Sequence, residues 1–456
     1  MHSPSAELTK ALALHVVAPS YRDGEKEALA VAKTGFIDSL AAAFAGAREP
    51  LVQILTEYFS SQQSGDDGEA IVPVSGKRYP SHIAACITGG AAHALDYDDV
   101  AMAAHPSAVL VPAILSEGQR LGSSGLHALR AYVVAYDIWS NLYSREPDPY
   151  HLKGWHPTSV FGTIAGAAAI AFLNRLSAQQ TQHALAIAAS LAGGLVANFG
   201  TMTKPFHAGR AASCAIEACR LAMLGMTAAP DVFEHQAGFL AAVSPAGRVD
   251  RDTKALSLGL RPSLLDTGLS IKRYPVCYSG HRIIDGVLDI VQRNDLSPAN
   301  VREVFVTIGP AQASMLRHGR PNNALEAKFS IEFAVAAALV AREVGLGQLI
   351  DSFVNRSDVR QQFEKVSIQI AGDPCPIDRA FSFADRVVIT TLDGRTFDSG
   401  DIRFAIGNAA RPLAPEQLHL KFLDCVRFGG VEVHSSKLLE RLGRLEAVHD
   451  VRSLFA

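Results

Sequence analysis

Gly200-Thr-Met-Thr-Lys-Pro-Phe-His-Ala-Gly-Arg-Ala-Ala212 is the stretch around which the predicted helical fold is organised. Here a loop carrying Lys204 meets a helix expected to begin at Pro205, because proline's φ is already helical and its missing N–H has no partner in a first turn. The small residues that follow allow another helix to approach closely. Unpaired N–H groups and a lysine at a helix start favour an anion. The alternative is an ordinary buried helix preceded by a surface lysine.

Two other helix starts have the same arrangement of a basic residue followed by proline. His105-Pro106 and His156-Pro157 each precede an apolar helical segment. The residue before a proline is kept out of the α region, so each basic side chain is expected on the turn at the helix start. Three such starts meeting in one place would form an anion-selective pocket. A structural role for each pair is the alternative, since the chain has 22 prolines and 16 histidines.

The composition is typical of a soluble globular protein. The chain has 456 residues, of which 48% are hydrophobic and 19% charged, so two or more domains are expected. A formal net charge of -3 without a long basic run argues against nucleic acid as a partner.

The cysteines and the apolar segments indicate a cytoplasmic protein. Six cysteines are scattered without a CxxC pair, which fits a reduced compartment. The N-terminus lacks the pattern of a secretory signal. The apolar segments 160–173 and 184–197 are shorter than the ~20 residues of a membrane span, so no membrane association is expected.

The first 260 residues have helical spacing almost throughout, and Ala, Leu and Gly dominate them. A Gly/Asp/Ser-rich loop is expected at 61–67, and Ser81 is expected to cap a helix that runs to about Leu95. The clearest predicted helices are 106–120, 128–142, 157–173, 178–198 and 205–226. This part is therefore predicted to be an all-α domain.

The pattern changes beyond Arg261. Residues 304–308 and 366–370 are predicted strands, 326–343 a helix, and 387–391 with 395–397 a hairpin around Asp393-Gly394. Helical spacing then returns. We therefore expect an all-α domain at 1–268, with 406–456 folding back onto it, and an α+β domain at 269–405.

An acidic motif, His93-Ala-Leu-Asp-Tyr-Asp-Asp99, comes before His105. His93, Asp96 and Asp99 are spaced by one helical turn each, so they are expected to share a face. A carboxylate beside a histidine fixes its tautomer and raises its basicity, as a general base requires. Divalent-metal binding is the competing interpretation, but no second ligand motif is evident and no metal is predicted.

The segment Ile271-Lys-Arg-Tyr-Pro-Val-Cys-Tyr-Ser-Gly-His281 is rich in functional side chains. Lys272 and Arg273 could clamp a carboxylate, and Tyr278 and His281 are further candidates for substrate binding. Cys277 and His281 are four residues apart and could touch on a helix, which suggests a thiolate nucleophile. A buried cysteine is more often a small core residue, which is the alternative.

Taken in order, these motifs resemble the MmgE/PrpD family, which includes 2-methylcitrate dehydratase, cis-aconitate decarboxylase and iminodisuccinate epimerase. The resemblance runs through most of the chain. Its motifs are His93-Ala-Leu-Asp-Tyr-Asp-Asp99, His105-Pro-Ser107, Gly154-Trp-His-Pro-Thr-Ser159, Lys204-Pro-Phe-His-Ala-Gly209, Lys272-Arg-Tyr-Pro275 and Glu326-Ala-Lys-Phe-Ser330.

The resemblance implies a large all-α domain, a smaller α+β lid, an active site between them, no metal or organic cofactor, and usually a homodimer. The shared chemistry is removal of a proton, or formation of an equivalent carbanion-like charge, next to a carboxylate of a small di- or tricarboxylate. Asp96, His105, His156, Lys204 and Lys272 match the family's active-site positions. The two lysines would hold substrate carboxylates, the two histidines would transfer protons, and Asp96 would orient one of them.

Two departures bear on which reaction is expected. Cys277 and Val100 stand where the decarboxylase branch carries a histidine and a threonine, which favours a dehydratase (a lyase) or an epimerase (an isomerase) over a cis-aconitate decarboxylase. In an epimerase, Cys277 could serve as the second acid/base. A carboxylate-binding or assembly protein that kept the fold without the chemistry is the alternative from another class.

Overall fold

The computed structural model describes residues 7–62, 68–255, 258–376 and 381–455, so most of the loop expected at 61–67 lies outside the described residues. The chain divides into two compact units, Met1–Leu269 with Pro415–Ala456, and Ser270–Ala414. Residues 406–414, which were expected with the first domain, lie in the second unit. There the Ile271 N–H donates a hydrogen bond to the Gly407 carbonyl (2.8 Å).

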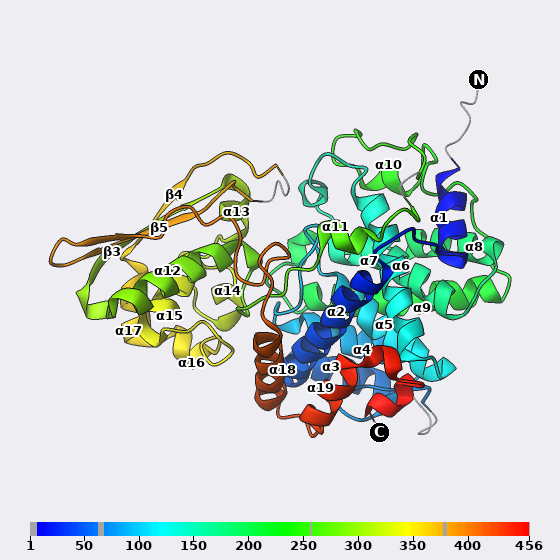
Figure 1. Ribbon diagram of the computed structural model, residues 1–456, viewed down its shortest axis with the longest axis horizontal. Coiled ribbons are helices and arrows are strands. Elements are labelled where there is room, and N and C mark those ends of the chain that lie inside the picture. Colours follow the sequence, from blue (N-terminus) through cyan, green and yellow to red (C-terminus); the bar gives the residue numbers. More distant parts are fainter. Residues whose placement is uncertain (1–6, 63–67, 256–257, 377–380, 456) are drawn as a thin grey trace. The chain divides into compact units, whose positions relative to one another are not determined.

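The first unit is built from helices, coloured blue to green and red in Figure 1, with one two-stranded hairpin. Its helices are α1 (Leu8–Val17), α2 (Glu25–Ala45), α3 (Pro50–Ser60), α4 (Ser81–Ala94), α5 (Pro106–Leu121), α6 (Gly125–Tyr143), α7 (Pro157–Leu173), α8 (Ala178–Leu191), α9 (Thr203–Met223), α10 (Phe239–Val243), α11 (Ser263–Thr267), α18 (Pro415–Gly429) and α19 (Ser435–Gly443). Strands β1 (Ala70–Ile71) and β2 (Arg78–Tyr79) pair antiparallel. The predicted mainly-α fold is confirmed.

Helices α4 and α9 pack against each other through glycines. A Cβ added to Gly89 of α4 would lie 2.9 Å from the Gly209 Cα of α9, and one added to Gly209 would lie 2.1 Å from the Cys86 carbonyl oxygen. Only the absence of side chains allows the two backbones to come this close. Because α4 leads to Asp96 and α9 carries Lys204, this contact fixes the distance between the two segments.

The predicted helix starts at Pro106 and Pro157 are confirmed. The start predicted at Pro205 is wrong by two residues, because α9 begins at Thr203 and Lys204 is itself helical. Helix α8 ends at Leu191 and not at residue 198. The physical reason is Gly193-Gly194, whose second residue has φ 127°, a conformation that side chains disfavour.

One further expectation for the first unit, the helix cap at Ser81, needs correction. Ser81 is the first residue of α4 and not its cap, since its hydroxyl donates to Glu117 (2.7 Å). A longer apolar segment than the two considered above, Glu25–Arg48, has the length and composition of a membrane span. Of its most apolar part, 72% is buried inside the protein, as in the core helix of a helical domain.

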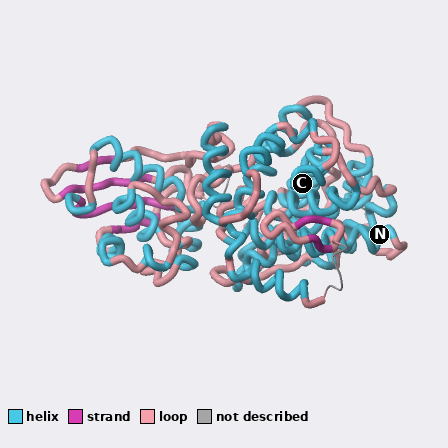
Figure 2. The backbone as a smooth tube through the Cα atoms, turned by 90° about the horizontal axis from the view of Figure 1, so that it is seen from below, coloured by secondary structure: helices cyan, strands magenta, loops and turns pink. Residues whose placement is uncertain are grey.

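The second unit contains a four-stranded sheet in the order β4-β3-β5-β6. Its strands are β3 (Val301–Ile308), β4 (Val366–Ile370), β5 (Arg386–Thr391) and β6 (Thr396–Asp398). Strand β4 is parallel to β3, and the other neighbours are antiparallel. Figure 2 shows these strands side by side in magenta.

Helices cover one face of this sheet (Figure 1). The helices of this unit are α12 (His281–Asn294), α13 (Pro310–Met315), α14 (Ala324–Ala327), α15 (Ile331–Ala341), α16 (Asp351–Val354) and α17 (Ser357–Phe363). Val304, Val306 and Ile389 alternate toward the core on β3 and β5.

The hairpin predicted around Asp393-Gly394 is confirmed, with Gly394 at φ 86° in the turn. The single helix predicted at 326–343 is wrong, because the chain leaves the helix after Ala327 and starts again at Ile331. Ser330 caps the second helix by accepting a hydrogen bond from the Phe333 N–H (3.0 Å). A strong local cap therefore divides a segment whose apolar spacing is continuous.

Candidate active site

Four segments of the first unit bring their polar side chains to one place. Asp96 follows the end of α4, His105 and His156 are the residues immediately before α5 and α7, and Lys204 is in the first turn of α9. All four residues are buried or half-buried. The side chain of His105 is 13% exposed, which is more than the side chains of Asp96 and Lys204. The sequence prediction that the three basic helix starts converge agrees with this arrangement.

Asp96 links the lysine to one histidine. Its Oδ1 lies 2.5 Å from Lys204 Nζ and 3.6 Å from His105 Nε2. Asp96 has φ 54°, a left-handed conformation that is uncommon for a residue other than glycine. The backbone therefore turns sharply at Asp96, directly after α4.

Asp98 is the carboxylate that joins two histidines, and the sequence analysis missed it. It accepts a hydrogen bond from His93 Nδ1 (3.0 Å), and its Oδ2 lies 3.2 Å from His105 Nδ1. The expectation that His93, Asp96 and Asp99 share a helical face is wrong, because α4 ends at Ala94. The turn at Asp96 replaces helical spacing, so Asp98 faces the histidines.

Asp99 points to another partner. It accepts hydrogen bonds from the N–H (3.1 Å) and the hydroxyl (2.8 Å) of Ser107, whose hydroxyl also contacts the Tyr132 hydroxyl (2.7 Å). Burial, followed by the nearby Asp38 and Asp98 carboxylates, raises the pKa of Asp99 well above its ordinary value. Asp99 thus ties the acidic segment to the start of α5.

A residue from the C-terminal part of the chain holds the same segment from the other side. Lys421 of α18 donates a hydrogen bond to the Tyr97 carbonyl (2.8 Å) and is ion-paired with Asp38 of α2 (2.6 Å). Both charged side chains are almost completely buried, with 4% and 0% exposed. Lys421 therefore acts as a support for the loop that carries Asp96 and Asp98.

His156 is the remaining member of the centre, and His207 lies beside it. Its Nδ1 lies 3.1 Å from Nδ1 of His207, so one of these two atoms must carry the proton. The His156 ring is 5.8 Å from that of His93 and meets the edge of Phe199 at 4.9 Å. Lys204 Nζ also lies over Phe199, 5.2 Å from the ring centre.

The electrostatics give the histidines different roles. Burial, together with the positive charges of neighbouring groups, lowers the pKa of His156 well below its ordinary value. Burial also lowers the pKa of His93 to about 4, although Asp98 opposes this. Burial alone would raise the pKa of Asp98, but the two histidines beside it reverse this and hold it well below its ordinary value. We therefore assign neutral His93 and His156 rings and an ionised Asp98 near pH 7.

The same cluster has the donor atoms of a metal site. His93, Asp96, Asp98 and His105 each offer one ligand atom, and all four atoms lie within 4.8 Å of one another. The Lys204 ammonium already lies 2.5 Å from Asp96 and occupies the position of a cation next to that carboxylate. A divalent ion would have to displace this ammonium, so the donor set fits a lysine-containing centre better than a metal.

The remaining predicted residues belong to the second unit. Arg273 lies 3.5 Å from Asp285 and packs over the Tyr274 ring, and the Tyr278 hydroxyl accepts a hydrogen bond from Asn408 (3.0 Å). Lys272 is fully buried. Their participation in the centre stays a prediction.

The expectation that Cys277 and His281 lie on one helix is wrong. Cys277 precedes a short 3-10 turn, and His281 is the first residue of α12. The Cys277 N–H donates to the Lys328 carbonyl (2.8 Å), while His281 Nε2 contacts the Val276 carbonyl (3.3 Å). Cys277 is buried, like the other five cysteines.

The sequence contained partial signals for the residues that it did not identify. Asp98 and His207 lie within motifs that were singled out, but helical spacing favoured Asp99 over Asp98, and the position before a proline favoured Lys204 over His207. Nothing in the local sequence distinguishes Lys421 from a surface lysine. Its role depends on a contact between residues 324 positions apart.

These features define a mainly helical protein of two units with a buried centre of carboxylates, imidazoles and one ammonium group. Comparison with known proteins agrees with this class. Residues 10–252 match the MmgE/PrpD N-terminal domain, and residues 274–442 match the MmgE/PrpD C-terminal domain. The chain belongs to the MmgE/PrpD family.

Several curated relatives are named cis-aconitate decarboxylases. The protein of Homo sapiens is 30% identical over 405 residues, which are 86% of this chain and 82% of the relative. That of Mus musculus is 30% identical over 404 residues, which are 86% and 80%. That of Aspergillus terreus is 26% identical over 371 residues, which are 76% and 74%.

Proposed function

We propose that this chain is a cofactor-independent enzyme that transfers protons next to a carboxylate group of a small di- or tricarboxylate. The observation that carries the proposal is the buried Lys204 ammonium, which Asp96 holds at 2.5 Å beside His105. A substrate carboxylate would be attracted to this ammonium. The same charge would stabilise the enediolate-like intermediate that forms when a proton or CO₂ leaves the neighbouring carbon.

The two histidines are suited to opposite proton transfers. His156 is the candidate proton acceptor, because burial keeps its ring neutral. His105 is the candidate donor, because its two ring nitrogens lie 3.2 Å from Asp98 and 3.6 Å from Asp96, and these carboxylates can orient the ring. We also propose that Lys272 binds a carboxylate group of the substrate.

Decarboxylation of cis-aconitate is the first candidate reaction, and the names of the curated relatives support it. In this reaction the bond from carbon to one carboxylate breaks and CO₂ leaves. The electron pair stays on the carbon skeleton next to a remaining carboxylate, and His105 delivers a proton there. A dehydratase or an epimerase of the iminodisuccinate type is the second candidate, favoured by Cys277 and Val100. We further propose a cytoplasmic homodimer.

The test uses the full chain in D₂O with cis-aconitate, 2-methylcitrate, citrate and iminodisuccinate, followed by proton NMR. Decarboxylation would give CO₂ and a product with one deuterium at the carbon that received the proton. Epimerisation would give deuterium uptake without loss of CO₂ or water, and dehydration would give an alkene. If no substrate reacts or exchanges, while calorimetry shows tight binding of the same compounds, the chain is a carboxylate-binding protein and the proposal fails.

A further inference from the structure

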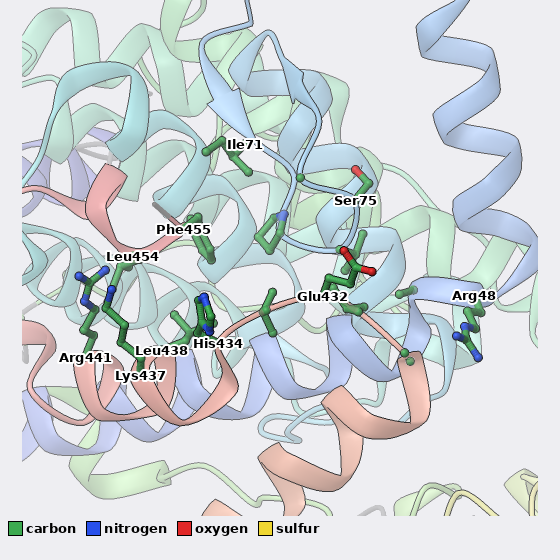
Figure 3. A pocket seen from close by; sticks show the side chains of 18 residues that line it. Arg48, Ile71, Ser75, Glu432, His434, Lys437, Leu438, Arg441, Leu454 and Phe455 are labelled. Carbon is green, nitrogen blue, oxygen red and sulfur yellow. The ribbon is translucent and has the colours of Figure 1, made fainter.

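A separate cavity of about 610 Å³ lies in the first unit, away from the residues of the candidate active site. Figure 3 shows its lining, which comes from segments far apart in the sequence. These segments are Ala47–Arg48 after α2, residues 71–76 around the β1–β2 turn, residues 429–434 between α18 and α19, the face of α19, and Leu454–Phe455. We call this cavity the basic pocket.

Three basic side chains of the pocket lie along one face of α19, from its N-cap, His434, to its last turn, which contains Arg441. His434, Lys437 and Arg441 are separated by three and four residues, which is helical spacing, and Figure 3 shows them close together. Arg48 lies at the opposite end. Glu432 is the single acidic residue of the lining, so the described lining carries an excess of positive charge.

These basic side chains lack the carboxylate partners that neighbouring basic residues have. Among the described residues, no Asp or Glu oxygen lies within 4.0 Å of a side-chain nitrogen of Arg48, His434 or Lys437. Arg441 donates to the Ser453 carbonyl. Nearby, Lys33 pairs with Glu446 and Arg452 with Asp450. The lack of carboxylate partners is therefore specific to the basic residues of the pocket.

Part of the remaining lining is apolar. Ile71, Pro73, Leu438 and Leu454 line the cavity together with Phe455, which lies near the basic side chains in Figure 3. The volume is within the range of about 300–1,000 Å³ that is usual for small-molecule sites. The pocket therefore combines a cationic end with an apolar wall large enough for an organic group.

We propose that the basic pocket binds a small organic phosphate, of the size of a nucleoside monophosphate. A phosphate monoester carries nearly two negative charges and three acceptor oxygens at pH 7, which matches the group formed by His434, Lys437 and Arg441. Phe455 and its apolar neighbours would cover the organic part. The helix dipole adds positive potential at the start of α19, next to His434. This inference is independent of the proposed function.

The pocket also adjoins the support of the candidate active site. Its segment 429–434 continues directly from α18, and α18 carries Lys421, which holds the Tyr97 carbonyl. A ligand in the pocket could therefore change the rate of turnover, so its binding is tested both by calorimetry and by its effect on that rate.

Calorimetry of the full chain with AMP, inorganic phosphate and adenosine tests the proposal. AMP should bind at least about tenfold more tightly than either fragment, and Lys437→Glu should weaken AMP binding by about tenfold or more. Lys437 is exposed, so the variant should fold, which circular dichroism verifies. Lys26→Glu, an exposed lysine of α2 outside the pocket, is the matched control and should bind AMP like the wild type.

Two outcomes would overturn the proposal. The first is no AMP binding at millimolar concentration, or equal weakening by Lys437→Glu and Lys26→Glu. The second is AMP binding that Lys204→Met abolishes and Lys437→Glu preserves, which would place the ligand in the candidate active site. A change in turnover with AMP that Lys437→Glu removes would show that the pocket regulates the enzyme.

Discussion

Lys204 Nζ lies 2.5 Å from Asp96 Oδ1, and less than a tenth of either side chain is exposed. The two residues are 108 positions apart and meet because α4 and α9 pack through Gly89 and Gly209. Lys204 supplies a positive charge at a fixed position in a buried centre that also contains two neutral imidazoles.

Replacing Lys204 should remove most of the activity. Lys204→Met should lower kcat/KM by about 10²–10³-fold, because the developing negative charge loses its ammonium. It should also destabilise the protein by about 3–5 kcal/mol, because Asp96 is left buried without its partner. The double variant Asp96→Asn/Lys204→Met should recover stability, measured by urea unfolding, without recovering activity. A wild-type value of kcat/KM in Lys204→Met would contradict the role of Lys204.

Asp98 should matter more for catalysis than its neighbour Asp99. Asp98→Asn removes the carboxylate that orients His93 and His105, so kcat should fall by about 10²–10⁴-fold and its pH profile should shift. Asp99→Asn is the matched control. Asp99 contacts Ser107 and has a raised pKa, so a neutral amide should keep kcat within about tenfold of the wild type. Equal losses in both variants would argue against a specific role for Asp98.

Lys421 should be required for the stability of the first unit and for the geometry of the site. Lys421→Met leaves Asp38 buried without its ion pair and releases the Tyr97 carbonyl, so the free energy of unfolding should fall by about 3–5 kcal/mol. The double variant Lys421→Met/Asp38→Asn should be more stable in urea unfolding than Lys421→Met alone. Additive losses would show that the two side chains do not interact.

The buried histidines should make the protein less stable in acid. Their pKa values are lowered by burial, to about 4 for His93 and well below the ordinary value for His156. Below about pH 6.5 the unfolded chain binds more protons at these positions than the folded one, so stability falls as the pH falls. Each histidine contributes a slope of up to about 1.4 kcal/mol per pH unit. Urea unfolding between pH 7.5 and about 4.5 should show a shallower decline in His93→Asn than in the wild type; parallel curves would refute the assignment.

The close approach of α4 and α9 should not tolerate a side chain. Gly209→Ala places a methyl group 2.1 Å from the Cys86 carbonyl oxygen, so it should destabilise the protein by about 1–3 kcal/mol and lower kcat. Gly443→Ala is the control, because an added Cβ there has no heavy atom within 4 Å among the described residues. Its effect should remain within about 1 kcal/mol of zero. A melting temperature unchanged by Gly209→Ala would show that the helices can separate at no cost.

Local sequence patterns predicted many elements correctly. Pro106 and Pro157 begin helices, and Asp393-Gly394 forms a hairpin turn, because these residues restrict their own backbone angles or those of their neighbours. The same reasoning failed at Pro205, because two residues before the proline, Thr203 and Lys204, already belong to the first turn of the helix. Four N–H groups at a helix start are unpaired in any case, so proline fits at the third position as well as the first.

The candidate site shows where local reasoning ends. Helical spacing placed Asp96 and Asp99 on one face with His93, but the chain turns at Asp96 and presents Asp98 to His93 instead. That turn is held by Lys421, whose sequence neighbours give no sign of this contact. The positions of carboxylates in a loop therefore depend on supports that lie elsewhere in the chain.

The sequence by itself determined the helical class of the protein, its family, and the basic residues that stand at the starts of three helices. These properties follow from the backbone preferences of single residues and from ordered motifs. Only the tertiary structure decided which carboxylate meets which histidine, that Asp96 pairs with Lys204, and that Asp99 turns to Ser107. The physical reason is that these contacts form between side chains brought together by helix packing, and local spacing does not specify how α4 and α9 cross.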